Sequence, residues 1–351
     1  MFSGTYFKHY SLFLFLGVTT VLIYISTENN FEDDLKETTQ SVSHIQPHTT
    51  KVVKFRNFGR INRKLEKPTN WKINPQEKSV FNRIQETCAR NNITSLLERT
   101  NFLYDFQHNA VYCWIRKVAS TSFTKIFSDM KNRHVTDQFY REVEFLAPES
   151  LDLLKSLNMD RNTFKLLIVR HPFERLVSSY RDRIADNSKY TDQSWIYVPK
   201  IFYITRRELF RSNSTTGSSL QRIFYSDRRL KLVPTFEEFV TYLIQESPSK
   251  YDPHWNQYYN HCSLCEINYD FILKLENYTP EQLDYIFWKL NLISGKKYLP
   301  NLQKSRGGPT NFNRTCEYFK KLFPETVIQL YEKYKIDFEM FDYKIGNYLE
   351  C

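Results

Sequence analysis

The chain has 351 residues, 41% of them hydrophobic, and carries 49 lysines and arginines against 39 aspartates and glutamates, a net charge of +10. That length and apolar content support a large folded core, and the basic balance favours an acidic partner such as a nucleic acid, an anionic lipid or an acidic glycan. The basic residues are dispersed and no RNA- or DNA-binding motif is visible, which argues against a nucleic-acid partner.

The first predicted element is an apolar segment at residues 10–26 that contains no charged side chain. Its length is near the lower limit of about 17 residues for a membrane-spanning helix. Lys8 precedes it and acidic residues follow it from Glu28 onward, and cationic flanks stay cytoplasmic. We therefore expect a short cytoplasmic tail at 1–9, a transmembrane signal-anchor at 10–26 and a type II topology; a cleaved signal peptide is the alternative.

Residues 27–75 are polar and irregular, which predicts a lumenal stem ahead of a globular domain at 76–351. In that domain strand and helix patterns alternate. Strands are expected at 110–117, 164–169 and 269–275. Helices are expected at 121–130, from Pro172, after the capping boxes Thr235/Glu238 and Thr279/Gln282, and at 324–334. This alternation is typical of an α/β fold with a mostly parallel central sheet flanked by helices.

Six cysteines occur, an even number that favours disulfides in a lumenal domain and leaves their pairing open. Cys262 and Cys265 form a C-x-x-C pair, for which zinc or redox chemistry is the alternative. Zinc would need a second pair at similar spacing, and the sequence has none. Four sequons permit N-glycosylation, at Asn92, Asn213, Asn277 and Asn313.

A predicted strand runs into a cationic, hydroxyl-bearing loop and then a helix at residues 114–123. A phosphate-binding loop offers backbone N–H groups, a lysine and hydroxyls at a helix N-terminus. Lys117, Ser120, Thr121 and Ser122 supply the side-chain part. The G-x-x-x-x-G-K-[ST] pattern that serves Mg²⁺-nucleotides is absent. The loop therefore suits a terminal group that needs no metal, such as a phosphosulfate, whose leaving phosphate the lysine can neutralise.

The same strand–loop–helix plan recurs at residues 166–178. Arg170 at the strand end can bind a phosphate through two N–H groups, and Ser178, two turns into the next helix, can hydrogen-bond the same group. An arginine at a strand end is common, so this segment alone is weak evidence. Together the two loops predict a site that grips both ends of one polyanionic nucleotide.

Both loops resemble those of Golgi carbohydrate sulfotransferases, in the group of the chondroitin, dermatan and N-acetylgalactosamine 4-O-sulfotransferases. Residues 116–123 match the 5'-phosphosulfate loop of that family, and residues 169–181 match its 3'-phosphate loop. The resemblance spans about residues 85–348, with further matching blocks at 236–244, 254–270 and 330–343.

Three positions depart from the family pattern. Arg116 stands where the family has proline, Ser120 where it has a small residue or cysteine, and His171 where it has an acidic residue. We expect these residues to keep a character that suits phosphate binding.

The resemblance implies a P-loop-like sulfotransferase fold and 3'-phosphoadenylyl sulfate (PAPS) as the sulfate donor, with no metal. It implies that Lys117 contacts the phosphosulfate and stabilises charge on the bridging oxygen. Thr121 and Ser122 are then expected at the 5' phosphate, and Arg170 and Ser178 at the 3' phosphate. The whole implied donor set is Arg116, Lys117, Val118, Ala119, Ser120, Thr121, Ser122, Arg170 and Ser178.

The acceptor hydroxyl needs a base as it attacks sulfur, and histidine is the usual choice because its unperturbed pKa of about 6.5 leaves it largely neutral near pH 7. His134 lies between the loops, and His134-Val135 resembles the His-Val of the uronosyl 2-O-sulfotransferases, where that histidine is the base. It is our first candidate. His254, before Trp255 in a matching block, is the second candidate, as base or acceptor contact.

The sequence thus predicts a PAPS-dependent carbohydrate O-sulfotransferase, single-pass in the Golgi membrane with a lumenal catalytic domain. By resemblance its acceptor is an acidic glycan, a chondroitin- or dermatan-type glycosaminoglycan sulfated at O4 of N-acetylgalactosamine. A catalytically inactive glycan-binding protein of the same fold is the alternative. A nucleotide kinase is disfavoured, because the glycines and metal ligands it needs are missing.

Overall fold

The computed structural model describes residues 75–135, 139–210, 224–292 and 306–351. The chain divides into Met1–Asn57 and Phe58–Cys351, and every described residue belongs to the second unit. The predicted signal-anchor at 10–26 and nearly all of the predicted stem at 27–75 lie outside the described residues. Of the described helices, none combines the length and apolarity needed to cross a membrane.

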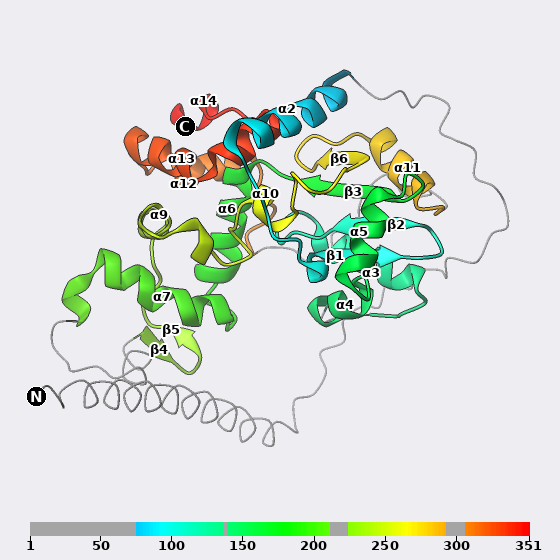
Figure 1. The fold of residues 1–351 in the computed structure, drawn as a ribbon. Coiled ribbons are helices and arrows are strands. Elements are labelled where there is room, and N and C mark those ends of the chain that lie inside the picture. Colours follow the sequence, from blue (N-terminus) through cyan, green and yellow to red (C-terminus); the bar gives the residue numbers. More distant parts are fainter. Residues whose placement is uncertain (1–74, 136–138, 211–223, 293–305) are drawn as a thin grey trace, which may run out of the picture. The chain divides into compact units, whose positions relative to one another are not determined.

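A four-stranded sheet carries the first part of the fold, in the order β1-β2-β3-β6 (Figure 1). Its strands are β1 Phe102–Asp105, β2 Ala110–Cys113, β3 Phe164–Val169 and β6 Phe271–Lys274. β1 pairs antiparallel with β2, whereas β2, β3 and β6 run parallel. Every residue of β3 is buried, including Lys165, as expected for a parallel strand covered on both faces. The prediction of a mostly parallel central sheet is confirmed.

Helices follow each parallel strand, which puts three strand-to-helix loops at one edge of the sheet. The helices are α2 Pro75–Asn91, α3 Ser120–Met130, α4 Phe139–Leu146, α5 Leu151–Met159, α6 Pro172–Ser179, α7 Asp192–Thr205, α9 Phe236–Gln245, α10 Tyr258–His261, α11 Pro280–Lys289, α12 Phe312–Phe319, α13 Pro324–Phe341 and α14 Gly346–Leu349. Short elements complete the described part: η1 Arg99–Asn101, the π-helix η2 Tyr180–Ile184, η3 Arg207–Phe210, η4 Pro248–Lys250, and the hairpin β4 Tyr225–Ser226 with β5 Arg229–Leu230.

Most predicted elements are found, with two boundary corrections. The strand expected at 110–117 ends at Cys113, so the remaining residues belong to the loop. The helix expected at 324–334 continues to Phe341, because its buried side chains recur through Phe338 and Phe341. Both predicted capping boxes are present, at the starts of α9 and α11.

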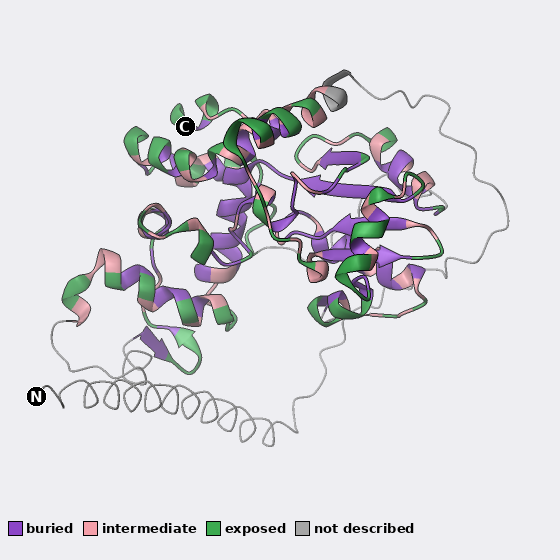
Figure 2. Cartoon of the chain, in the orientation of Figure 1, coloured by how far each residue is buried: buried purple, intermediate pink, exposed green. Residues whose placement is uncertain are grey.

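Two hydrophobic clusters form the core. One surrounds the sheet and includes Tyr112 and Phe123, and the other lies among the helices around Phe173 and Trp255. All eight residues of α6 are buried, and Figure 2 shows this helix in purple between the sheet and the helical part. The loop between β3 and α6 therefore lies where the two clusters meet.

Three disulfides cross-link the described chain: Cys88–Cys265, Cys113–Cys262 and Cys316–Cys351. The two cysteines of the C-x-x-C pair have different partners, one in α2 and one at the end of β2. Neither is therefore a thiolate available to zinc. The Cys113–Cys262 bond anchors β2 four residues before Lys117.

Candidate functional site

The loop after β2, residues 114–119 and here called the first loop, has an unusual backbone. Lys117 and Ala119 both have positive φ, at 71° and 63°. Such left-handed conformations cost a residue with a side chain about 1–2 kcal/mol, and nucleotide-binding loops usually meet the need with glycine. Val118 between them is fully buried and holds the turn in the sheet core. The loop therefore adopts, with Lys117 and Ala119, two left-handed positions that usually favour glycine.

Side chains at both ends of the first loop are held in place. The Arg116 guanidinium stacks over the Trp114 ring at 4.7 Å and lies 5.2 Å from the Tyr140 ring. The three predicted hydroxyl residues form the first turn of α3 and are buried: Ser120, Thr121 and Ser122.

Arg170 joins the second loop, residues 170–171, to the first. Its Nη1 lies 3.5 Å from the Lys117 carbonyl oxygen, and its Nε lies 3.3 Å from a carboxylate oxygen of Glu174. Its Nη2 donates to the Thr310 carbonyl. Ser178 is buried two turns into α6. The structure thus brings the two predicted loops together, with the cationic residue of one against the backbone of the other.

Arg175 ties the same region together and was not singled out from the sequence. Its Nε donates to the Arg116 carbonyl at 3.1 Å and its Nη2 to the Pro253 carbonyl at 2.9 Å. Its guanidinium also lies 4.7 Å from the ring of Tyr258. Arg175 therefore fixes the first loop against the segment that carries His254.

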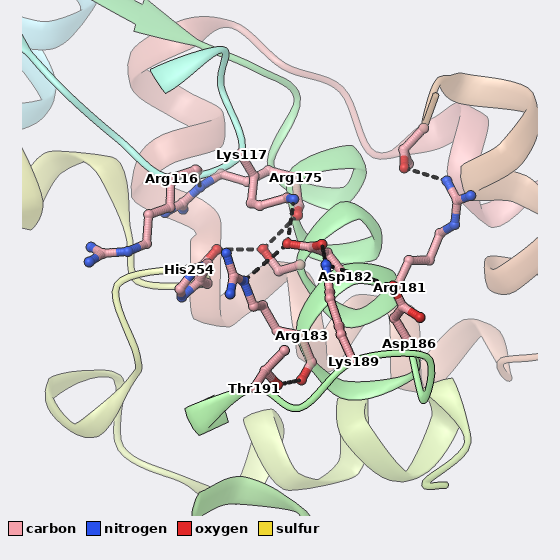
Figure 3. A network of polar contacts seen from close by, with 12 residues as sticks. Arg116, Lys117, Arg175, Arg181, Asp182, Arg183, Asp186, Lys189, Thr191 and His254 are labelled. Carbon is pink, nitrogen blue, oxygen red and sulfur yellow. Dashed lines mark hydrogen bonds and ion pairs between the residues drawn. The ribbon is translucent and has the colours of Figure 1, made fainter. Parts of the chain in front are cut away.

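Asp182 is the centre of the polar network in Figure 3, and nothing in its sequence pattern singled it out. Its carboxylate pairs with Lys117 at 2.9 Å, Arg183 at 3.0 Å and Lys189 at 2.5 Å. Burial alone would raise the pKa of Asp182, but these cations hold it well below its usual range. Burial in turn lowers the pKa of Lys117, against the opposing effect of Asp182.

A third loop, residues 306–310 and here called the C-terminal loop, completes the site and was also missed. Arg181 donates to the Thr310 hydroxyl at 2.7 Å and to the Arg306 carbonyl at 2.7 Å. Gly307 has a φ of 75°, and a Cβ there would lie 3.3 Å from Arg181 Nη2. A Gly-Gly pair after a basic residue is the signal that could have pointed to this loop.

The two histidine candidates occupy different surroundings. His254 is buried, its Nδ1 lies 2.6 Å from Asp252 Oδ1, and Figure 3 draws it beside Arg116 and Arg183. His134 is exposed and follows the end of α3 remote from the first loop. Among the described residues no hydrogen bond or ion pair joins His134 to Lys117.

His171 does not keep the phosphate-binding character expected of it. Its ring packs against aromatic side chains, at 5.1 Å from Phe338, 4.9 Å from Tyr343 and 4.5 Å from Tyr348. Burial lowers its pKa to about 3, so the ring is neutral. Its Nδ1 accepts from the Phe173 N–H at 3.3 Å, and the residue acts as the N-cap of α6.

Buried neutral histidines predict that acid destabilises the fold. Burial lowers the pKa of His171 to about 3 and those of His254 and His261 to about 4, below the unfolded value near 6.5. Their stabilisation is complete above that unfolded value and is lost as the pH falls. For each of these histidines, the free energy of unfolding falls by about 2 kcal/mol between pH 6.5 and pH 5.

Asp337 acts in the opposite sense, because burial raises its pKa to about 7, and its stabilisation is lost as the pH rises through that value. Burial also raises the pKa of Glu174 and Glu276, which act in the same sense as Asp337. Asp182 and Asp252, whose pKa values are lowered, add to the effect of the three histidines. Urea unfolding is therefore expected at a lower midpoint at pH 5 than at pH 7, with a smaller shift in His171→Phe. Equal midpoints at the two pH values would contradict the assignment.

In the part of the chain that the structure describes, no group of three or more His, Cys, Asp or Glu side chains is arranged to hold a metal ion. The charges that gather at the site are instead Lys117, Arg170, Arg183 and Lys189 with their carboxylate partners. The described site can bind anions through cationic side chains and backbone N–H groups.

Comparison with known proteins gives consistent matches. The sulfotransferase family matches residues 100–344. Carbohydrate sulfotransferase 11 of Rattus norvegicus is 30% identical over 291 residues, which is 76% of each chain. Carbohydrate sulfotransferase 14 of Danio rerio is 23% identical over 279 residues, 75% of this chain and 70% of its own. Carbohydrate sulfotransferase 8 of Mus musculus is 25% identical over 277 residues, 74% of this chain and 62% of its own. No solved structure gives a significant match.

Proposed function

The chain belongs to the sulfotransferase family and is a carbohydrate sulfotransferase, and from that premise we propose that it transfers a sulfuryl group from PAPS to a hydroxyl of an acidic glycan. The observation that carries the donor assignment is the contact of Arg170 with the Lys117 carbonyl. It brings the two cationic loops together and thereby supports a single small nucleotide bound by both.

The residues of the site fit a nucleotide that bears phosphate at one end and phosphosulfate at the other. Lys117, whose pKa burial lowers, is largely buried, and its ammonium pairs with Asp182 at 2.9 Å. A positive charge held in such a site stabilises a leaving phosphate strongly. We assign the 5' phosphosulfate to Arg116, Lys117, Thr121 and Ser122, and the 3' phosphate to Arg170 and Ser178.

We assign an acidic acceptor of the chondroitin or dermatan type, sulfated at O4 of N-acetylgalactosamine. The resemblance of the two loops supports this, together with Arg183 and Lys189 beside Lys117. A glycan with a uronate next to the acceptor sugar would find complementary charge there.

We also propose that residues 10–26 anchor the protein in the Golgi membrane, with 1–9 cytoplasmic, 27–75 a lumenal stem and 76–351 the catalytic domain. The apolar segment after Lys8 supports this topology. The three disulfides of the described residues fit an oxidising lumen.

Donor binding is the direct test. Purified full-length protein is titrated with adenosine 3',5'-bisphosphate by calorimetry, then assayed with radiolabelled PAPS against a panel of desulfated glycosaminoglycans. Absence of any affinity for the bisphosphate would refute the proposal. Affinity without transfer to any glycan would instead favour the catalytically inactive glycan-binding protein.

Arg170→Lys is expected to weaken bisphosphate binding about 10- to 100-fold, because lysine keeps the charge but loses the two-pronged contact with a phosphate. Arg161→Lys, at an exposed arginine ahead of β3, is the matched control and is expected to bind normally. Equal affinities for the two variants would remove Arg170 from the donor site.

A further inference from the structure

Asp252 and His254 form a buried pair whose geometry fixes one tautomer of the imidazole. Asp252 Oδ1 lies 2.6 Å from His254 Nδ1 and accepts from the His254 backbone N–H at 2.8 Å. Gln193 of α7 donates to the other carboxylate oxygen at 3.3 Å. An ionised carboxylate only accepts hydrogen bonds, so Nδ1 carries the proton and Nε2 presents a lone pair.

His254 Nε2 is buried and has no hydrogen-bond partner among the described residues. A buried polar atom left without a partner costs about 1–3 kcal/mol, and such atoms in a folded protein call for an explanation. In Figure 3 the imidazole lies beside the Arg183 guanidinium, within the network that contains Lys117. An acceptor hydroxyl delivered to this site would supply the missing partner.

We propose that His254 Nε2 is the base for the acceptor hydroxyl and that Asp252 is the residue that positions it. The inference rests on the proposed function. The acceptor oxygen bonds to sulfur, the bond from sulfur to the bridging phosphate oxygen breaks, and the hydroxyl proton passes to Nε2. The electron pair of the broken bond stays on the leaving phosphate, beside Lys117.

Because Nε2 is screened from solvent, the acceptor reaches it only when a covering side chain moves. Arg183 lies beside the ring, and Asp182 holds it by an ion pair at 3.0 Å. A carboxylate or sulfate of an acidic acceptor competes directly for that guanidinium. The acceptor charge thus acts on the arginine beside the base, which gives acidic glycans an advantage over neutral ones.

The base is neutral at the pH of turnover. Burial lowers the pKa of His254 to about 4, while Asp252 opposes the shift; the other charged groups that face the ring are Arg183 and Arg116. His254 therefore accepts a proton without first losing one. His134, the first candidate from the sequence, is exposed and lacks a carboxylate contact among the described residues.

The test compares two Asp–His pairs of the same chain. Asp105 and His108 in the β1–β2 turn repeat the geometry, with 2.5 Å between Nδ1 and Oδ1 and 2.9 Å from the His108 N–H to the same oxygen. That turn lies at the opposite end of β2 from the first loop. Asp105→Asn and His108→Asn are therefore matched controls.

We expect His254→Asn in the full-length protein to lower kcat about 100-fold or more, and Asp252→Asn about tenfold or more, because its amide no longer holds the correct tautomer. Affinity for adenosine 3',5'-bisphosphate stays at the wild-type value, and Asp252→Glu restores part of kcat. Both control variants turn over normally.

Bisphosphate binding also reports that each variant is folded, and it separates this inference from the proposed function. If wild-type protein does not bind the bisphosphate, the proposed function fails. If His254→Asn binds it and turns over at the wild-type rate, the base assignment is overturned. Loss of turnover in His134→Ala, with His254→Asn active, would transfer the role to His134.

Discussion

Lys117→Met is expected to lower the rate of sulfate transfer about 10³-fold while leaving the protein folded. The methionine fills the space of the lysine stem but supplies no positive charge to the leaving phosphate, and one such electrostatic contact is worth about 10²–10³ in rate. Asp182 keeps Arg183 and Lys189 as partners, so the variant does not strand an unpaired carboxylate.

The loss is expected in kcat more than in donor affinity, because the leaving-phosphate charge that we propose Lys117 neutralises grows as the sulfur–oxygen bond breaks. Single-turnover transfer and bisphosphate titration separate the two quantities. Lys155→Met, at an exposed lysine of α5 that pairs with Asp152, is the control. A Lys117→Met protein with wild-type kcat would show that the first loop does not act on the leaving group.

Removal of the Cys113–Cys262 disulfide is the second large effect. The two cysteines are 149 residues apart, and for a loop of that length the chain-entropy estimate is about 5 kcal/mol. Cys88–Cys265 still closes an overlapping loop, so we expect the Cys113→Ala/Cys262→Ala variant to lose about 3 kcal/mol.

This variant is also expected to bind adenosine 3',5'-bisphosphate about tenfold more weakly, because Cys113 anchors the strand that ends in the first loop. A tenfold loss of affinity corresponds to about 1.4 kcal/mol of binding free energy. Cys88→Ala/Cys265→Ala is the matched control: it opens a loop of similar length, 177 residues, but ends on α2 instead of β2. Urea unfolding measures stability and calorimetry measures affinity. Equal affinities in the two double variants would mean that the disulfide stabilises the fold without shaping the site.

The two loops could be predicted because each depends on local information. An apolar run, a cationic residue at its end and a helix start stand next to one another in the chain, and the structure brings Lys117 and Arg170 into one region. The capping boxes of α9 and α11 were equally local. Strand order and disulfide pairing were not predictable, since they depend on contacts between distant parts of the chain, up to 177 residues apart for Cys88–Cys265.

Asp182, Arg175 and the C-terminal loop were missed for a related reason. In the sequence, Asp182 is one charged residue among arginines and reads as part of a solvated helix face. Its role depends on the π-helix at 180–184, which places it opposite Lys117 from another element. Asp252 shows the same limit: its spacing from His254 is visible in the sequence, but burial of the pair is not.

The contacts of Thr310 have a consequence for how the enzyme matures. Arg170 and Arg181 both end on the C-terminal loop, which leaves the ribosome only after six-sevenths or so of the chain has been made. Until then, Arg170 and Arg181, which are buried in the folded protein, lack the carbonyl and the hydroxyl of Thr310 as hydrogen-bond partners. A premature stop codon just before residue 306 should therefore yield a product without sulfotransferase activity that cellular quality control removes. This holds even though all four strands of the sheet are present in that product.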